Sequence, residues 1–443
     1  MDSANTHSDV ASAPEVTPLL VPAEGLPPII HYPSDIPEVV NKLLAGEGPI
    51  AVDAERASGY KYSQRAYLIQ IRRKGSGIFL IDPIACPDLS SISHALKDCE
   101  WIIHASTQDL ACLREVGISP TSLFDTELGA RIAGFERVGL GALIELLLHR
   151  SLAKEHSAVD WSTRPLPEPW LNYAALDVEL LVELRDEVES VLRESGKLEW
   201  AKEEFATVLA APPSPPREEP WRRTSGLHQV KKRRALAIVK LLWIERDGIA
   251  QSRDIAPGRI LPDSAIVAAA LNPPANSAGL MAIRAFHGRG AEKYLRNWWS
   301  AIERALAIPE DDLPELSKKS DGPPPPKVWI VRNPLAHARL SHARAAMKSI
   351  SEEWSIPIEN LLTPDTLRRL CWEPPSEVAP WLSARGARHW QISLLEGALS
   401  EALLATEALP DAEAEPEPVP EPAPEQLSGP PLQSMNYATL KLR

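Results

Sequence analysis

Cysteine is scarce in this chain, and hydrophobic residues never form a long uninterrupted run. The cysteines are too few and too widely spaced to predict a disulfide framework or a zinc site: Cys86, Cys99, Cys112 and Cys371. They fit a reducing compartment, and we expect a cytoplasmic protein. No apolar stretch approaches the roughly 20 residues that a membrane-spanning helix needs, so no membrane partner is expected. The N-terminus has no basic segment followed by an apolar one, which argues against a secretory signal.

Positive charge is also in short supply, because the net charge is -13. Taken alone, that value argues against a nucleic-acid partner, but the charges are segregated along the chain. Acidic residues gather in a proline-rich stretch near the C-terminus. Basic residues crowd the middle of the chain: Arg222, Arg223, Lys231, Lys232, Arg233 and Arg234. The net charge therefore says little about any single surface.

Changes in composition divide the 443 residues into globular units and the segments between them. We expect three globular units, at 29–209, 225–308 and 328–407. Proline-rich segments at 210–224 and 309–327 are predicted to be linkers. Residues 1–28, rich in Ser, Ala and Pro, and the acidic, proline-rich residues 408–443 are predicted to be disordered.

The first unit begins with patterns typical of strands and continues with patterns typical of helices. Apolar runs predict strands at 50–53, 66–71, 78–81 and 101–103, and Lys74-Gly75-Ser76-Gly77 predicts a hairpin turn between the second and third. From Thr107 onward, apolar residues recur with helical periodicity. This order predicts a mixed sheet flanked by helices, an α/β fold.

The second and third units are both predicted to be helical, and they look related to each other. Residues 259–274 can be aligned with 360–375, because both stretches contain a Leu, a Pro-Asp, an apolar helical turn and a double Pro at matching positions. Asp263 and Asp365 would each begin a helix. Two unrelated helical domains with ordinary helix starts would explain the match as well.

Two acidic residues end the first predicted strand of the chain. Asp53 and Glu55 share one face of that strand, and Ala54 points away. Adjacent carboxylates repel each other unless a cation lies between them, and divalent cations prefer oxygen ligands. Solvated acids in a loop are the alternative interpretation.

Further acids follow at suggestive spacings. Asp109 is expected in the first turn of a helix after the strand at 101–103, where it could simply complement the helix dipole. Tyr173 and Asp177 are four residues apart and therefore lie on one helix face. A half-buried tyrosine above a surface acid would explain that pair too.

Together these residues form a candidate catalytic set: Asp53, Glu55, Asp109, Asp177 and Tyr173. Four carboxylates can hold two Mg²⁺ or Mn²⁺ ions, and such a pair can hydrolyse a phosphodiester. Tyr173 would orient the attacking water, because a hydroxyl with a pKa near 10 is a poor base at neutral pH. Asp125 or Glu127 could replace one of the ligands, although both are also explained as acids at a helix start.

The order D-x-E, H-x4-D and Y-x3-D resembles the DEDDy branch of 3′–5′ exonucleases, which have a ribonuclease-H-like fold. Asp160-Trp-Ser-Thr-Arg-Pro-Leu166 and Tyr173-Ala-Ala-Leu-Asp-Val178 are similar to stretches of the ribonuclease D family. The resemblance implies that the four acids are metal ligands and that Tyr173 positions water. It also implies trimming of structured RNA, such as tRNA precursors, with release of 5′-nucleotides. Ala54 departs from the family's usual Thr, with little effect expected.

The second unit resembles an HRDC domain, through Arg234-Ala-Leu-Ala-Ile-Val-Lys-Leu-Leu-Trp243 and Pro257-Gly-Arg-Ile-Leu-Pro-Asp263. The third unit would then be a diverged second copy. This resemblance implies RNA binding, and the basic run from Arg222 to Arg234 would contact phosphates, although a solvated helix face is equally possible. A monomeric exoribonuclease is the leading hypothesis. A DNA 3′–5′ exonuclease and a non-catalytic RNA-binding protein on a nuclease scaffold are the alternatives.

Overall fold

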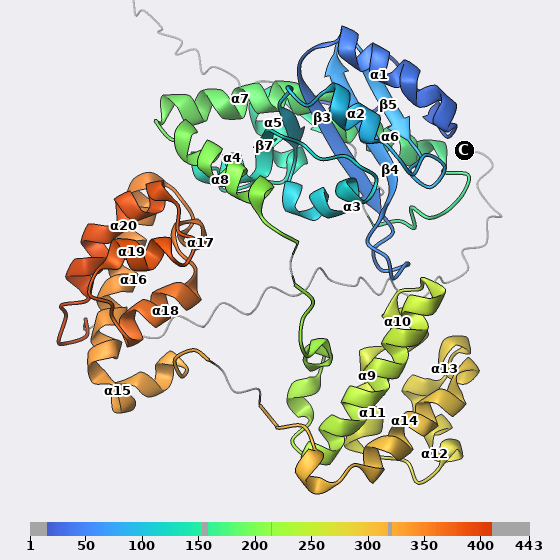
Figure 1. Ribbon diagram of the computed structural model, residues 1–443, viewed down its shortest axis with the longest axis vertical. Coiled ribbons are helices and arrows are strands. Elements are labelled where there is room, and N and C mark those ends of the chain that lie inside the picture. The colour runs from blue at the N-terminus through green and yellow to red at the C-terminus, as the bar shows by residue number, and fades with distance from the viewer. Residues whose placement is uncertain (1–15, 153–157, 214, 318–320, 410–443) are drawn as a thin grey trace, which may run out of the picture.

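The chain folds into one unit that contains a sheet and two units that are entirely helical (Figure 1). This arrangement comes from a computed structural model, which describes residues 16–152, 158–213, 215–317 and 321–409. The order of a mixed α/β unit followed by helical units agrees with the fold predicted from the sequence. No helix within the described ranges is long and apolar enough to cross a membrane.

The first unit contains a six-stranded mixed sheet with the order β2-β5-β4-β3-β6-β7. Strands β3, β4 and β5 form an antiparallel meander, and the remaining neighbours are parallel. The strands are β2 (Ile29–Ile30), β3 (Glu47–Arg56), β4 (Ala66–Lys74), β5 (Gly77–Ile81), β6 (Trp101–Ile103) and β7 (Leu123–Asp125). All four predicted strands and the predicted hairpin are therefore confirmed.

The two faces of the sheet are buried by different helices. On one face, Leu68 and Leu80 pack with Ala174 and Ala175 of α6 (Glu168–Glu179), which crosses β3, β4 and β5. The opposite face contributes to a larger core. The first unit contributes these helices to that core: α1 (Ile36–Ala45), α2 (Ser90–Ala95), α3 (Leu110–Glu115), α4 (Thr126–Ala133), α5 (Leu140–Leu148), α7 (Leu181–Glu194) and α8 (Leu198–Ala210).

The N-terminal segment contains one strand that the sequence did not predict. Strand β1 (Thr17–Leu19) pairs in parallel with β8 (Arg150–Leu152), and the Thr17 amide donates to the His149 carbonyl at 3.0 Å. The prediction of disorder to residue 28 is thus wrong for this strand, because its partner lies far away in the sequence. Residues 1–15 and 410–443, also predicted to be disordered, lie outside the described residues.

The second and third units repeat a series of helices at a constant offset. Helices α9 (Arg233–Arg253) and α16 (Pro334–Trp354) both have 21 residues, and the second begins 101 residues after the first. The same offset relates two further pairs: α10 (Pro257–Ile260) with α17 (Ile358–Leu361), and α11 (Asp263–Leu271) with α18 (Pro364–Trp372). The aligned stretches 259–274 and 360–375 thus fall on matching elements.

The remaining helices complete each unit. The second unit adds α12 (Ser277–Met281), α13 (Arg289–Lys293) and α14 (Leu295–Ala307). The third unit adds α15 (Trp329–Arg332), α19 (Val378–Ser383) and α20 (His389–Ala402). The second unit has its own core, which extends from Trp221 to Leu313 and so includes residues of both expected linkers. The third unit shares one continuous core with the first unit.

Candidate metal centre

The register of the sheet and the position of α6 bring the acidic residues together. Asp53 lies opposite Gln70, and Glu55 opposite Leu68, on the face that α6 covers. Tyr173 and Asp177 are both on α6. Ala54 belongs to the core on the other face, as its position between the two acids predicted. One strand and one helix therefore supply four of the five candidate residues.

Three carboxylates converge closely enough to share a cation. Oxygen atoms of Asp53, Glu55 and Asp177 all lie within 4.8 Å of one another. The Tyr173 hydroxyl is hydrogen-bonded to the Asp177 carboxylate one turn away on the same helix. Glu55 is 9% exposed, so little water reaches its carboxylate to offset the repulsion.

Asp109 lies near this group but is held differently. It occupies the N-cap position of α3 rather than the predicted first turn, and its side chain makes no capping hydrogen bond. Its Oδ1 atom lies 3.4 Å from Nη2 of Arg56 and has no hydrogen-bond partner among the described residues. The same nitrogen of Arg56 donates to Oε1 of Gln108 at 3.2 Å. Asp109 is not among the three carboxylates that converge within 4.8 Å.

Asp125 stabilises, through hydrogen bonds, the turn that precedes Asp109. Its carboxylate accepts hydrogen bonds from the amides of Ala105 and Ser106 at 3.1 and 2.8 Å. It also caps α4 by accepting from the amides at the start of that helix. Glu127 pairs with Arg131 at 2.7 Å. Asp125 and Glu127, which could have replaced one of the metal ligands, therefore make the interactions expected of acids at a helix start.

Burial and mutual repulsion raise the pKa values of these acids. Burial is the main reason why the pKa of Glu55 lies well above its usual range, and Asp53, Asp177 and Asp109 raise it further. Burial, with the Asp53 charge, raises the pKa of Asp109 to about 8, although Arg56 opposes the shift. The pKa of Asp177 is raised by burial and by Asp53. Without a cation, this site resists becoming fully charged.

These properties fit a site for divalent cations. The donor set consists of hard carboxylate oxygens, which Mg²⁺ and Mn²⁺ prefer. The buried Oδ1 of Asp109, which accepts no hydrogen bond among the described residues, is the kind of atom that a bound ion would satisfy.

Two residues beside the acids were not predicted from the sequence. Arg56 directly follows the D-x-E pattern, and its position alone could have suggested it. Gln70 is fully buried opposite Asp53, and neither polar atom of its amide has a hydrogen-bond partner among the described residues. Only the strand register identifies Gln70 as a neighbour of the site.

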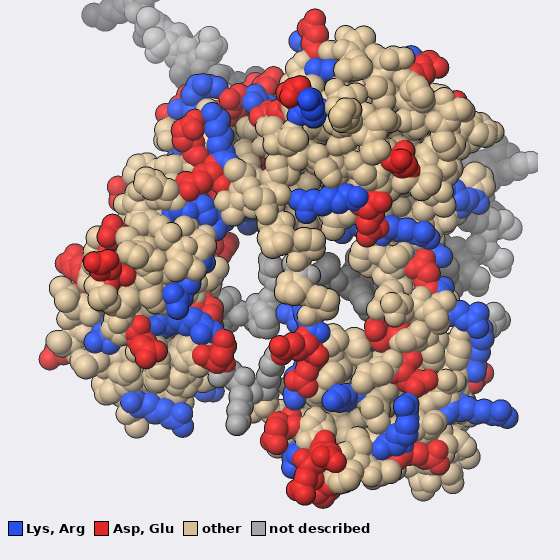
Figure 2. All heavy atoms as spheres, in the orientation of Figure 1, with Lys and Arg blue, Asp and Glu red and all other residues tan. Residues whose placement is uncertain are grey.

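The basic residues in the middle of the chain fall into two groups. Three donate to carbonyl oxygens or carboxylates of their own unit: Arg222, Arg233 and Arg234. Arg234, for example, donates to the Ala305 carbonyl at 3.1 Å and to Glu310 at 2.7 Å. The other three are exposed: Arg223, Lys231 and Lys232. Figure 2 shows basic and acidic side chains interspersed over the visible face of the molecule.

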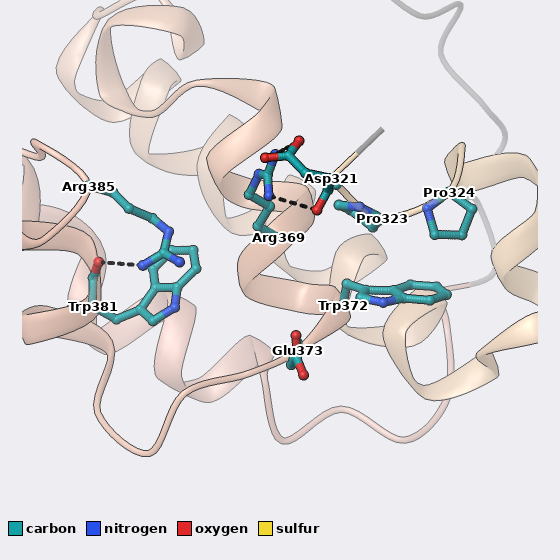
Figure 3. A pocket seen from close by; sticks show the side chains of 9 residues that line it. Asp321, Pro323, Pro324, Arg369, Trp372, Glu373, Trp381 and Arg385 are labelled. Atoms are coloured by element: carbon teal, nitrogen blue, oxygen red, sulfur yellow. Dashed lines mark hydrogen bonds and ion pairs between the residues drawn. The ribbon is translucent and has the colours of Figure 1, made fainter. Parts of the chain in front are cut away.

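A separate pocket lies on the third unit and contains none of the predicted site residues. Arg385 stacks on the ring of Trp381 at 3.6 Å, and Arg369 pairs with Asp321 at 3.0 Å (Figure 3). Pro324 approaches from the preceding segment, and its carbonyl accepts from the Trp329 indole at 2.6 Å. The pocket thus forms where the segment that enters this unit packs against it.

Three family models match the chain. One described as a 3′–5′ exonuclease covers residues 28–193, and an HRDC domain covers 235–302. One described as a 3′ to 5′ exonuclease C-terminal domain covers 322–403. The third unit therefore matches a description of its own, and its origin as a second HRDC copy stays a prediction.

Relatives and solved structures agree with these matches. The chain is 32% identical over 280 residues to ribonuclease D of Zymomonas mobilis. The aligned region covers 61% of this chain and 70% of that protein. A crystal structure of a protein from Bifidobacterium adolescentis has a TM-score of 0.81 and 39% identity, over 88% of this chain and all of the other. RNase D of Escherichia coli, described as an exoribonuclease involved in structured RNA processing, has a TM-score of 0.63 and 23% identity, over 85% of this chain and 98% of the other. The last similarity concerns the fold alone.

Proposed function

The chain belongs to the ribonuclease D family and is a 3′–5′ exoribonuclease, and from this premise we propose how it acts and on which RNAs. Asp53, Glu55, Asp109 and Asp177 hold two divalent metal ions, Mg²⁺ or Mn²⁺. The convergence of three carboxylates within 4.8 Å, Glu55 buried and Asp53 and Asp177 half-buried, is the observation that carries this proposal. Water-exposed acids in a loop, the alternative interpretation, would not pack against a helix.

Each acidic residue contributes oxygen ligands from a fixed position. Asp53 and Glu55 are held by the sheet, Asp177 by α6, and Asp109 by the turn that Asp125 anchors. When bound, the two ions would activate the attacking water and stabilise the leaving 3′ oxygen. Arg56, which lies 3.4 Å from Oδ1 of Asp109, would partly offset the negative charge of the four carboxylates.

Tyr173 orients the water rather than removing its proton. Burial, together with the charges of Asp177 and Glu55, raises the pKa of Tyr173 above its usual value. The hydroxyl therefore keeps its proton at neutral pH and donates it to Asp177, which leaves the hydroxyl oxygen to accept a hydrogen bond from the water. Replacing the hydroxyl by hydrogen should slow hydrolysis without removing a metal ligand.

The substrates are the 3′ ends of structured RNAs such as tRNA precursors, and the products are 5′-nucleotides. Support comes from the similarity to E. coli RNase D, which is described as acting in structured RNA processing. Phosphate contacts come from the basic run of the second unit, chiefly from exposed Arg223, Lys231 and Lys232. We place the protein in the cytoplasm, as a monomer.

The test measures degradation of a 5′-labelled structured RNA in the presence of Mg²⁺ or Mn²⁺. It compares Asp53→Asn and Tyr173→Phe with the matched control Asp98→Asn, which replaces an exposed acid of the same unit. Loss of an outer neighbour of a metal ligand costs about 10–100-fold, so loss of a ligand should cost more than about 100-fold. Tyr173→Phe should lower the rate but leave the metal affinity unchanged. Full activity of Asp53→Asn would overturn the metal site, and faster digestion of single-stranded DNA than of RNA would overturn the substrate.

A further inference from the structure

We propose that the second unit positions the active site of the first unit, through Asp254 and the loop at residues 57–65. This loop joins β3, which carries Asp53 and Glu55, to β4. The inference rests on the proposed metal site, and it assigns to the helical unit a role in the chemical step in addition to RNA binding.

Asp254 is the centre of the contact. Its Oδ1 accepts a hydrogen bond from the Ser63 amide at 2.8 Å. Its Oδ2 lies 3.5 Å from the guanidinium of Arg65 and 3.4 Å from the Tyr67 hydroxyl, which donates to it. A single carboxylate thus fixes both the backbone of the loop and the side chains where the loop enters β4.

Neighbouring residues of the second unit hold the other half of the loop. The Ala256 amide donates to the Tyr60 carbonyl at 3.0 Å. Arg259 donates to the Gly59 carbonyl at 2.8 Å and stacks over the Tyr60 ring at 4.1 Å. Figure 1 shows the loop reaching down from β3 and β4 to the end of the second unit near α10.

The geometry of Asp254 suits it for this role. It follows the last turn of α9 in the left-handed conformation, with φ 47°. Its amide donates to the Ala250 and Gln251 carbonyls, so the residue is fixed to the helix end. Non-glycine residues are uncommon in this conformation, although Asp and Asn tolerate it well.

The loop connects this contact to the reacting groups on two sides. It begins at fully buried Ala57, directly after Arg56, which pairs with Asp109. On the other side, the Tyr60 hydroxyl donates to the Ala158 carbonyl at 3.4 Å, in the segment that leads toward α6 and Tyr173. Releasing the loop would therefore loosen the end of β3 at Glu55. Displacements of about 1 Å in an active site can cost about 100-fold in rate.

A small substrate separates this role from RNA binding by the second unit. A dinucleotide occupies only the cleavage site, whereas a structured RNA can also contact the helical units. If Asp254 positions the active site, its loss slows turnover of both substrates. If the second unit only binds RNA, dinucleotide turnover is unaffected.

The experiment compares full-length Asp254→Asn and Arg259→Ala with the control Asp311→Asn, an exposed acid of the same unit. Asn keeps the size and the backbone preference of Asp254 but removes its charge. We expect kcat for the dinucleotide and the structured RNA to fall about 10-fold or more in Asp254→Asn, with KM little changed. Amide hydrogen exchange within 57–65 should rise in both test variants.

Normal dinucleotide turnover in Asp254→Asn, or unchanged exchange in the loop, would overturn the inference. Asp53→Asn, assayed beside these variants, keeps the two hypotheses separate. If Asp53→Asn is active, the proposed metal site is wrong. If it is inactive while Asp254→Asn turns the dinucleotide over normally, only the positioning role is wrong.

Discussion

The second and third units place the same corner against the first unit, but they attach there by different contacts. The corner is the left-handed residue after the 21-residue helix, Asp254 in one unit and Ser355 in the other, 101 residues apart. Asp254 presents a carboxylate to a loop. Ser355 instead packs its backbone tightly against Gly134, and Lys197 donates to the carbonyl of adjacent Trp354 at 2.5 Å.

The rest of each contact widens this difference. Trp200 of the first unit stacks on Trp390 and packs against Trp354, at the edge of a core that continues into the third unit. From the first unit, only half-buried Tyr62 packs against the core of the second, among the described residues. Polar contacts of this kind leave little apolar surface to expose on separation. Although the two helical units share a series of helices, the third unit packs into the core of the first unit, whereas the second unit binds a loop of the first unit.

Glu204→Ala should break the third unit's contact with the largest effect on stability. Glu204 is buried, and it accepts from the Trp390 indole at 2.9 Å and pairs with Arg388. Removing one partner of a buried pair costs about 3–5 kcal/mol. Urea unfolding should show this loss of unfolding free energy. The control is Glu203→Ala: the Glu203 carboxylate accepts backbone amides at the start of α20, and its removal should cost about 1 kcal/mol. Equal effects of the two substitutions would contradict the importance of the buried pair.

Metal binding should distinguish the two cores during thermal unfolding. The first and third units share a core, whereas the second has its own, so calorimetry should resolve two transitions. Mn²⁺ at 100 times its dissociation constant should stabilise the first–third transition by about 2.7 kcal/mol and leave the other in place. A shift of both transitions would show that the second unit is coupled more strongly than its contacts imply.

The metal-free stability of the first–third core should fall as pH rises. Burial raises the folded-state pKa of Asp109 to about 8 from 3.8. Between about pH 4 and 8 the folded protein therefore binds more protons than the unfolded chain, and raising the pH destabilises it. Because metal binding needs the charged carboxylates, the Mn²⁺ stabilisation should grow over the same range. Denaturant midpoints with and without Mn²⁺ test both trends, and a metal-free stability that rises toward pH 8 would contradict them.

Gly134→Ala should disturb the Ser355 corner by an intermediate amount. Gly134 has φ 102°, and an added Cβ would lie 2.7 Å from the Ser355 carbonyl oxygen. Backbone strain of this kind costs about 1–3 kcal/mol. The matched control is Gly139→Ala, where nothing lies within 4 Å of the new atom and the backbone is unstrained. Similar unfolding free energies for the two variants would mean that the corner can separate easily.

Arg259→Ala should have the smallest effect on stability. Its guanidinium is exposed, and an exposed cation–π contact contributes about 0.5–1 kcal/mol. Its effect should be confined to the second unit's contact with loop 57–65, whereas Arg253→Ala, an exposed neighbour on α9, should leave the loop unchanged. Limited proteolysis within the loop measures the difference. A loss above about 2 kcal/mol would mean that the second unit is as firmly attached as the third.

Features set by neighbours in the sequence could be predicted. Apolar runs predicted β3, β4 and β5, and helical spacing predicted α9. The two-residue period of a strand placed Asp53 with Glu55 on one face, the 3.6-residue period of a helix did so for Tyr173 with Asp177, and the structure confirms these placements. Side-chain direction in a strand or helix depends only on position along that element, so no tertiary information was needed.

Features that join distant parts of the chain required the structure. Strand β1 pairs with a partner more than a hundred residues away, and Arg234 donates to a carbonyl of helix α14. The hydrogen bond between Asp254 and the Ser63 amide could not be predicted from the spacing of neighbouring residues. The sequence by itself determined four strands of the six-stranded sheet, the helical nature of the second and third units, and the candidate ligands. Only the tertiary structure decided which charges are already paired and which unit holds the active-site loop, because those contacts depend on packing between residues that the chain does not place next to each other.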